Sequence, residues 1–179
     1  MKKYRASIAI LLILSSFAFT YITKQSITKS AITFQIKNLG INVNGSFSGL
    51  RADINFDPEH LETSTIEASV QSNTVNTDND SRDTHLKSED FFDVDKYPDI
   101  KMKSVSIKHN SGNNYTGTFN LTIKDKTNQV QVPFSYAENG STANFKGTFK
   151  IKRTDYGVGG RSMVMSNDVT ITIDVSTSK

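Results

Sequence analysis

The stretch YTGTFNLTIKDKTNQVQVPFSY, residues 115–136, indicates the fold class most directly. Its first half has an apolar residue or glycine at every second position: Tyr115, Gly117, Phe119, Leu121 and Ile123. Thr and Asn fill the positions between, which is the period of a β-strand with one buried and one solvated face. After turn residues at 125–128, the second half repeats this parity: Val130, Val132, Phe134 and Tyr136. We therefore predict an antiparallel hairpin, with Pro133 on its outward face at an edge or a bulge.

The same alternation continues on both sides of the hairpin, from about residue 31 to the end of the chain. About seven or eight short strands are expected, and their spacing alone suits either a sandwich or a barrel. Between residues 100 and 107 the apolar parity changes, which predicts a β-bulge near Lys103 or Ser104. The charged stretch 80–98 breaks the β rhythm, so we expect one or two short helices there, capped by Asp80 or Ser81.

The N-terminus resembles an export signal, because Lys2, Lys3 and Arg5 precede an almost uncharged apolar run. Small residues at Ser16 and Ala18 favour a signal peptide over residues 1–18. The alternative is an uncleaved anchor that extends to about residue 23, at the short limit of a membrane span. Either interpretation predicts a periplasmic or secreted protein, with one β-domain over residues 31–176.

Composition excludes several classes of protein and site. The 179 residues include no cysteine, so disulfides and thiolate metal sites are ruled out. The formal net charge of +3 equals the three basic residues of segment 1–18, which contains no acidic residue. The remaining domain is therefore neutral, whereas a nucleic-acid partner would need a basic field.

The sequence contains no recognisable catalytic motif. His60, His85 and His109 lie in separate segments without metal-ligand spacing, so we expect no metal, no required cofactor and no enzyme. His60 and His109 are interpreted as loop residues near strand ends. In the predicted insertion, Arg82, Asp83 and His85 have two interpretations: they bind a polar head group, or they form a network that pins the insertion.

Arg153 is a second unusual charge, because it continues the inward parity of Phe145, Phe149 and Ile151. An inward arginine needs a partner. It either caps backbone carbonyls at the end of the barrel or contacts a ligand.

The stretch SRDTHLKSEDFFDVDKYPDI, residues 81–100, closely resembles the signature of the YceI-like family. Weaker matches in the same order occur at residues 34–40, 121–123 and 153–158. The resemblance implies an all-β fold, an eight-stranded antiparallel lipocalin-like barrel with a helical insertion over residues 80–98. It also implies an apolar tunnel for a polyisoprenoid or similar amphiphile. Lys124 departs from the family pattern, in which a glycine commonly follows the segment that corresponds to residues 121–123.

The resemblance thus predicts binding, transport or storage of an isoprenoid or other long-chain lipid, without chemistry. Residues assigned to the tail by their inward parity are Phe47, Ile54, Ile66, Val70, Phe119, Leu121, Val132, Phe134, Phe145, Phe149, Ile171 and Ile173. Phe91 and Phe92 are expected to cover the mouth. We also expect that the protein, as a monomer or homodimer, can contact a membrane to exchange the lipid. The alternatives are a protein- or surface-binding β-domain with a filled core, and a lipid-modifying envelope enzyme that uses Arg82, Asp83 and His85.

Overall fold

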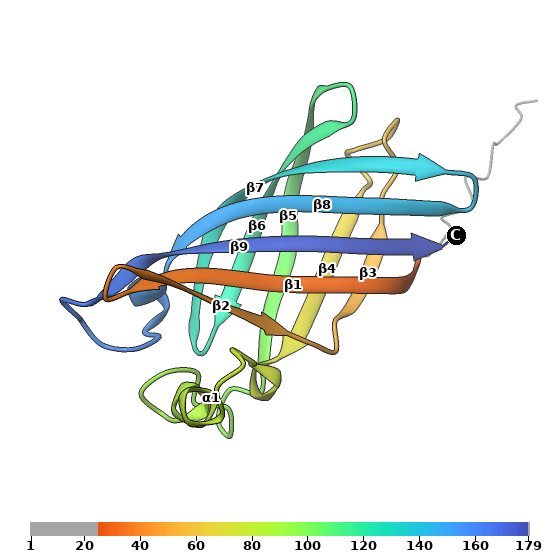
Figure 1. Cartoon of the computed structure of the whole chain (residues 1–179). Coiled ribbons are helices and arrows are strands. Elements are labelled where there is room, and N and C mark those ends of the chain that lie inside the picture. The colour runs from red at the N-terminus through yellow and green to blue at the C-terminus, as the bar shows by residue number, and fades with distance from the viewer. Residues whose placement is uncertain (1–24, 179) are drawn as a thin grey trace, which may run out of the picture.

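The computed structural model describes residues 25–178, which form one curled antiparallel sheet with a small helical insertion (Figure 1). The strands of this part are β1 (Ser26–Asn38), β2 (Ile41–Phe47), β3 (Arg51–Asn55), β4 (Thr65–Gln71), β5 (Asp99–Ser111), β6 (Asn114–Ile123), β7 (Lys126–Asn139), β8 (Thr142–Lys152) and β9 (Met165–Ser178). Their order in the sheet is β2-β1-β9-β8-β7-β6-β5-β4-β3. The helical elements are η1 (Ser72–Thr74), α1 (Asp80–Lys87) and η2 (Arg153–Tyr156).

The all-β, lipocalin-like prediction is confirmed, but the predicted strand count of eight is wrong, since nine strands occur within residues 25–178. The unpredicted strand is β2. It follows a two-residue turn in which Leu39 and Gly40 both have positive φ, 52° and 78°. Such turns normally contain Asn, Asp or Gly, so the leucine concealed this one. Within β2, the ring of Phe34 occupies the space where a side chain at Gly45 would stand.

The hairpin of β6 and β7 confirms the predicted parity, because its inward side chains from Tyr115 to Tyr136 are buried or nearly so. Its turn is tighter than predicted, since Ile123 pairs with Lys126 and only Lys124 and Asp125 lie between. Pro133 also lies as predicted. The N–H of Tyr136 donates to the carbonyl of Asn113, just before β6. Pro133 has the opposite parity along β7, so its nitrogen, which carries no hydrogen, faces β8. The β7–β8 ladder ends there, at the pair Phe134 and Gly147.

The predicted bulge is present in β5, where Val105 is the extra residue between Ser104 and Ser106. The bulge turns the Val105 side chain outward, and 53% of the residue is exposed. The predicted helical insertion contains a single α-helix, α1, followed by turns. Its N-cap is Asn79, whose side chain accepts from the Arg82 N–H, and the predicted caps Asp80 and Ser81 lie within the helix.

The edge strands β2 and β3 are not joined by a ladder. Two isolated bridges close the sheet instead, between Gln25 and Ile54 and between Ser46 and Asn76. None of the helices within residues 25–178 is long and apolar enough to cross a membrane. The predicted signal or anchor lies outside the described residues.

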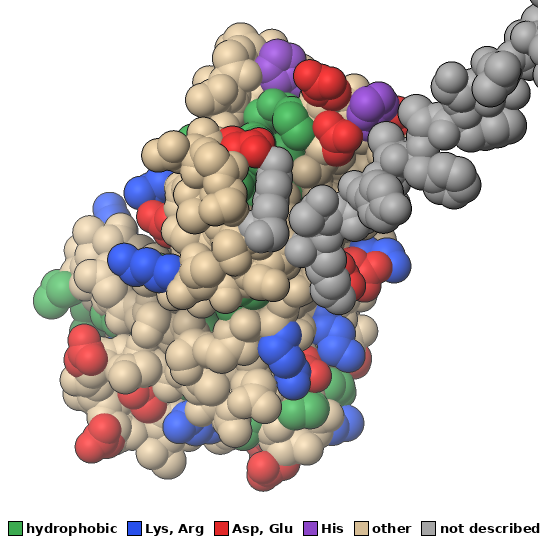
Figure 2. All heavy atoms as spheres, turned by 90° about the vertical axis from the view of Figure 1, so that its right-hand side faces the viewer, with side chains coloured by type: hydrophobic (Ala, Val, Ile, Leu, Met, Phe, Trp, Pro, Cys, Tyr) green, Lys and Arg blue, Asp and Glu red, His purple; other side chains and the backbone are tan. Residues whose placement is uncertain are grey.

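The interior divides into two ends with different contents. The first, the filled end, contains five mutually packed rings: Phe56, Tyr115, Phe134, Tyr136 and Phe145. It lies at the right of Figure 1, and Figure 2 views the molecule from that side. Apart from the grey atoms, that face shows hydrophobic side chains only in small groups among charged ones. The second, the hollow end, lies toward α1 and the β1–β2 turn.

Candidate functional site

The hollow end encloses a cavity of about 200 Å³. Its walls are aliphatic and aromatic side chains from opposite parts of the curled sheet. Ile36 of β1, Ile171 of β9 and Leu121 of β6 are examples. The described polar residues at the cavity are few: Asn38, Ser69, Thr77, Lys101, Arg82 and Arg153. Such a lining favours an apolar molecule with one polar end.

The insertion that contains α1 covers the open side of this cavity. Leu86, Phe91 and Phe92 line it from the insertion. The Phe92 ring packs edge-on against Phe47 of β2, with ring centroids 5.4 Å apart. The two phenylalanines thus lie where the sequence predicted a cover.

Thr77 connects the insertion to the cavity through a small polar network. Its hydroxyl donates to the Asp83 carboxylate, and its N–H donates to the same group at 2.9 Å. Nε of Arg82 donates to the Thr77 hydroxyl at 2.7 Å, and Nη2 donates to the Thr77 carbonyl at 2.7 Å. Arg82 and Asp83 therefore form the pinning network of the second interpretation, with Thr77 as the shared partner. Arg82 is half-buried and also lines the cavity.

His85 does not line the cavity. Its ring packs edge-on against Phe91 at 4.9 Å, and its Nε2 lies 3.9 Å from the Asp90 carboxylate on the exposed side of the insertion. Asp83 is likewise absent from the cavity wall because its carboxylate is turned toward Thr77. Of the three polar residues predicted together, only Arg82 reaches the cavity.

Arg153 is almost fully buried at the cavity wall, with only 3% of the residue exposed. Its guanidinium donates to backbone carbonyls of Val158 and Gly160 in the loop before β9, and of Met165 and Ser166 at the start of β9. Burial lowers the pKa of Arg153 below its ordinary value, although an arginine stays protonated. The prediction that Arg153 caps carbonyls is therefore confirmed, and the same side chain borders the cavity.

Parity predicted the cavity wall only in part. The predicted residues that line it are Phe47, Val70, Arg82, Phe91, Phe92, Leu121, Phe149, Arg153, Ile171 and Ile173. Ile54, Phe134 and Phe145 belong instead to the filled end. Phe119 and Val132 are buried in the cluster beneath the cavity, and Ile66 packs between the two ends. The wall residues that the sequence did not single out are Ile32, Phe34, Ile36, Asn38, Val43, Leu50, Ala68, Ser69, Thr77, Leu86, Ile100, Lys101, Met102, Ile123, Ile151, Val158, Met165 and Val169.

The sequence contained a pattern that could have identified some of the missed wall residues. Ala68 shares the inward parity of Ile66 and Val70, so alternation extended along β4 would have found it. No residue of β1 or β5 was chosen, although Ile36 alternates with Phe34 and Met102 with Ile100. Thr77 and Met165 lie outside any alternating run. Their places depend on how the insertion and the loop before β9 fold back over the sheet.

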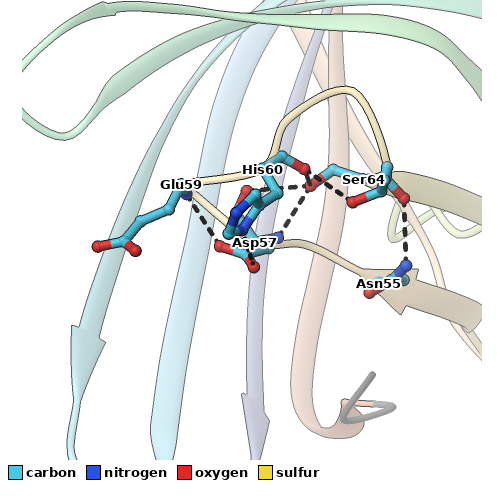
Figure 3. Close-up of polar contacts among 6 residues, drawn as sticks. Asn55, Asp57, Glu59, His60 and Ser64 are labelled. Atoms are coloured by element: carbon cyan, nitrogen blue, oxygen red, sulfur yellow. Dashed lines mark hydrogen bonds and ion pairs between the residues drawn. The ribbon is translucent and has the colours of Figure 1, made fainter. Parts of the chain in front are cut away.

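The β3–β4 loop brings together an aspartate, a histidine and a serine, yet not in a catalytic arrangement (Figure 3). Nδ1 of His60 lies 2.9 Å from the Asp57 carboxylate. The Ser64 hydroxyl donates to the carbonyls of Asp57 and His60, so it is not aligned with the imidazole as a nucleophile. These contacts tie the loop over the filled end, as expected of a loop histidine. Within residues 25–178 no cluster of three or more His, Asp or Glu could hold a metal.

Comparison with known proteins agrees with this architecture. The family model described as the YceI-like domain matches residues 24–177. A curated relative from Pseudomonas fluorescens, called UPF0312 protein, is 31% identical over 153 residues, 78% of this chain and 77% of the relative. The crystal structure of BcnA from Burkholderia cenocepacia has a TM-score of 0.79 and 26% identity, covering 82% of this chain and 95% of BcnA. A polyisoprenoid binding domain from Saccharophagus degradans shares the fold, with a TM-score of 0.63 and 14% identity over 87% of this chain and 97% of that domain.

Proposed function

Because the chain belongs to the YceI-like family, we propose that it binds the apolar tail of an isoprenoid or similar amphiphile in its hollow end and carries or stores that lipid in the bacterial envelope. The observation that supports this most is the cavity itself, whose wall is apolar except for a few residues. A solved structure of the same fold is described as a polyisoprenoid binding domain. The family and its structural neighbours point to a binding protein rather than an enzyme.

Burial of an apolar chain supplies enough free energy for this role. Each buried CH₂ contributes about 0.8 kcal/mol, so several isoprene units gain on the order of ten kcal/mol before ordering costs. The present cavity of about 200 Å³ is smaller than common ligand pockets, which span roughly 300–1,000 Å³. A long tail therefore requires the hollow end to widen, or part of the tail to remain outside.

The proposal puts the polar end of the ligand beside Arg82. Thr77 fixes two of the guanidinium nitrogens, and Arg82 has no ion pair among residues 25–178. Its Nη1 donors therefore suit a head group with an oxygen acceptor, such as a phosphate, quinone or amide.

The direct test is native mass spectrometry of the full chain purified gently from a bacterial envelope, followed by organic extraction. A stoichiometric isoprenoid or long-chain mass is the expected result. A ligand-free mass, together with no uptake of added prenyl lipid, would refute the proposal and favour a binding domain that acts through its surface. Fractionation of the same cells should recover the chain with the envelope, whereas a cytoplasmic chain would refute the proposed location.

A matched pair of substitutions tests whether the cavity is the site. Ala68→Phe adds a phenyl ring inside the cavity wall, so lipid uptake should fall at least tenfold, which corresponds to about 1.4 kcal/mol. Ala137→Phe makes the same change on an exposed position of β7 and should leave uptake unchanged. Equal uptake by the two variants would place the ligand elsewhere.

A further inference from the structure

Four large apolar side chains are exposed together at the hollow end. Leu39 lies in the β1–β2 turn, Ile41 is the first residue of β2, and Met163 and Val164 lie in the loop before β9. We call these four residues the apolar tip. Leu39 is 71% exposed, Ile41 is 69% exposed and Met163 is fully exposed. Single exposed apolar residues are common, but a group of four in two adjoining loops marks an interaction surface.

The two parts of the tip are held together. The N–H of Leu39 donates to the carbonyl of Val164 at 2.8 Å, and the β1–β2 turn and the blue loop before β9 meet at the left of Figure 1. The Ser162 hydroxyl accepts from the N–H groups of Val164 and Met165, and Arg153 binds the carbonyl of Gly160 in the same loop. The tip is thus an anchored projection of the barrel.

The tip adjoins the cavity directly. Asn38, Val43 and Met165 line the cavity, and each lies within two residues of a tip side chain. A lipid that leaves a bilayer beside the tip would therefore pass from one apolar surface to the next. The four residues of the tip thus lie beside the cavity and not beside the filled end.

Charge supplies the second argument. Residues 37–43 and 157–164 contain two cations, Lys37 and Arg161, and no acidic residue. Both cations are exposed, and on the neighbouring strands Lys152 pairs in register with Asp168. Apolar side chains flanked by cations suit the interface of a bilayer with anionic head groups.

We propose that the apolar tip inserts into anionic lipid bilayers and so places the mouth of the cavity at the membrane surface. The inference rests on the proposed function, because it assigns the place of lipid exchange. It names the surface that makes the contact and the lipid charge that favours it.

The chain has no cysteine, so a single one can carry a polarity-sensitive NBD probe in the full-length protein. Met163→Cys places the probe on the tip, and Val105→Cys places it on the exposed bulge of β5 as the matched control. On vesicles of phosphatidylglycerol and phosphatidylcholine, the probe at 163 should shift to the blue and brighten several-fold, and a lipid-linked nitroxide should quench it. The probe at 105 should not respond. Since both variants keep residues 1–24, any contribution of that segment is the same in each.

Three results would overturn the inference: no response at 163, equal responses at both positions, or a blue shift at 163 that grows with protein concentration without vesicles. The last would assign the tip to contact between copies of the chain. Lys37→Glu with Arg161→Glu should weaken the response on anionic vesicles, and an unchanged response would refute the charge argument. Native mass spectrometry of the same samples separates the two proposals, because the probe reports insertion whether or not the cavity holds lipid.

Discussion

The filled end and the hollow end are built from the same strands with the same alternation, yet the cavity described above lies in the hollow end, whereas packed rings occupy the filled end. Along β6, Tyr115 packs into the filled end, whereas Leu121 and Ile123 line the cavity. Along β8, Phe145 belongs to the filled end and Ile151 to the cavity wall. Alternation therefore decides which side chains point inward, and their size and what lies opposite decide whether the interior is closed.

The ring of Phe56 illustrates how the filled end is closed. It enters from the end of β3 and contacts four other rings, with centroid distances from 4.7 to 5.9 Å. The Tyr136 hydroxyl donates to the Glu138 carboxylate at 2.8 Å, and burial is the main reason why the pKa of Tyr136 lies above its ordinary value. Among residues 25–178 the hollow end has no equivalent central ring, and its wall residues face the insertion across the cavity.

The largest predicted effect is a difference in stability between substitutions at the two ends. Phe56→Ala should lower the free energy of unfolding by about 3–5 kcal/mol, because it leaves a void among four rings. Phe47→Ala removes the same ring from a half-buried position at the cavity and should cost much less. Urea unfolding measured by circular dichroism gives both values. Similar losses for the two variants would show that the ends do not differ in packing as described.

The second effect concerns Arg153, which is almost fully buried at the wall of the hollow end. Arg153→Met should lower the free energy of unfolding by roughly 2–3 kcal/mol, since buried loop carbonyls lose charge-assisted hydrogen bonds. Amide hydrogen exchange should quicken in residues 157–166 before it does in the filled end. Arg161→Met is the control, because Arg161 is exposed in the same loop. If it matches Arg153→Met, the buried network is not the cause.

The smallest effect is a pH dependence confined to the loop over the filled end. The hydrogen bond between Asp57 and His60 raises the pKa of His60 and lowers that of Asp57. The contribution of His60 to stability is therefore complete below its unfolded pKa, about 6.5, and is lost as pH rises through the folded value. The contribution of Asp57 is present above about 3.9 and is lost as pH falls through its lowered folded value.

NMR titration checks this directly. The His60 ring should titrate at a higher pH than a free histidine, and Asp57→Asn should bring it back. Signals from the cavity wall should not follow the His60 titration, because the loop lies at the other end of the barrel. A response of the cavity to the same pH change would contradict the separation of the two ends.

Much of the fold could be predicted because buried and exposed side chains alternate along a half-buried strand, so apolar residues recur at every second position. The hairpin of β6 and β7, the bulge at Val105 and the outward Pro133 all follow from parity and from the missing N–H of proline. β2 could not be predicted, because its turn places a leucine in a left-handed conformation. The cavity was predicted only through the family resemblance, and parity alone assigned Phe134 and Phe145 to it although they fill the opposite end.

The two isolated bridges between the sheet edges have a mechanical consequence. Near the cavity, residues 46–48 are joined to residues 74–76 by four hydrogen bonds, two from the bridge between Ser46 and Asn76 and two between Ser48 and Thr74. These four hydrogen bonds can break without separating any strand from the neighbour with which it forms a ladder. Separation of these four hydrogen bonds would widen the hollow end, as the proposed binding of a long lipid tail requires, without disturbing the packed rings of the filled end.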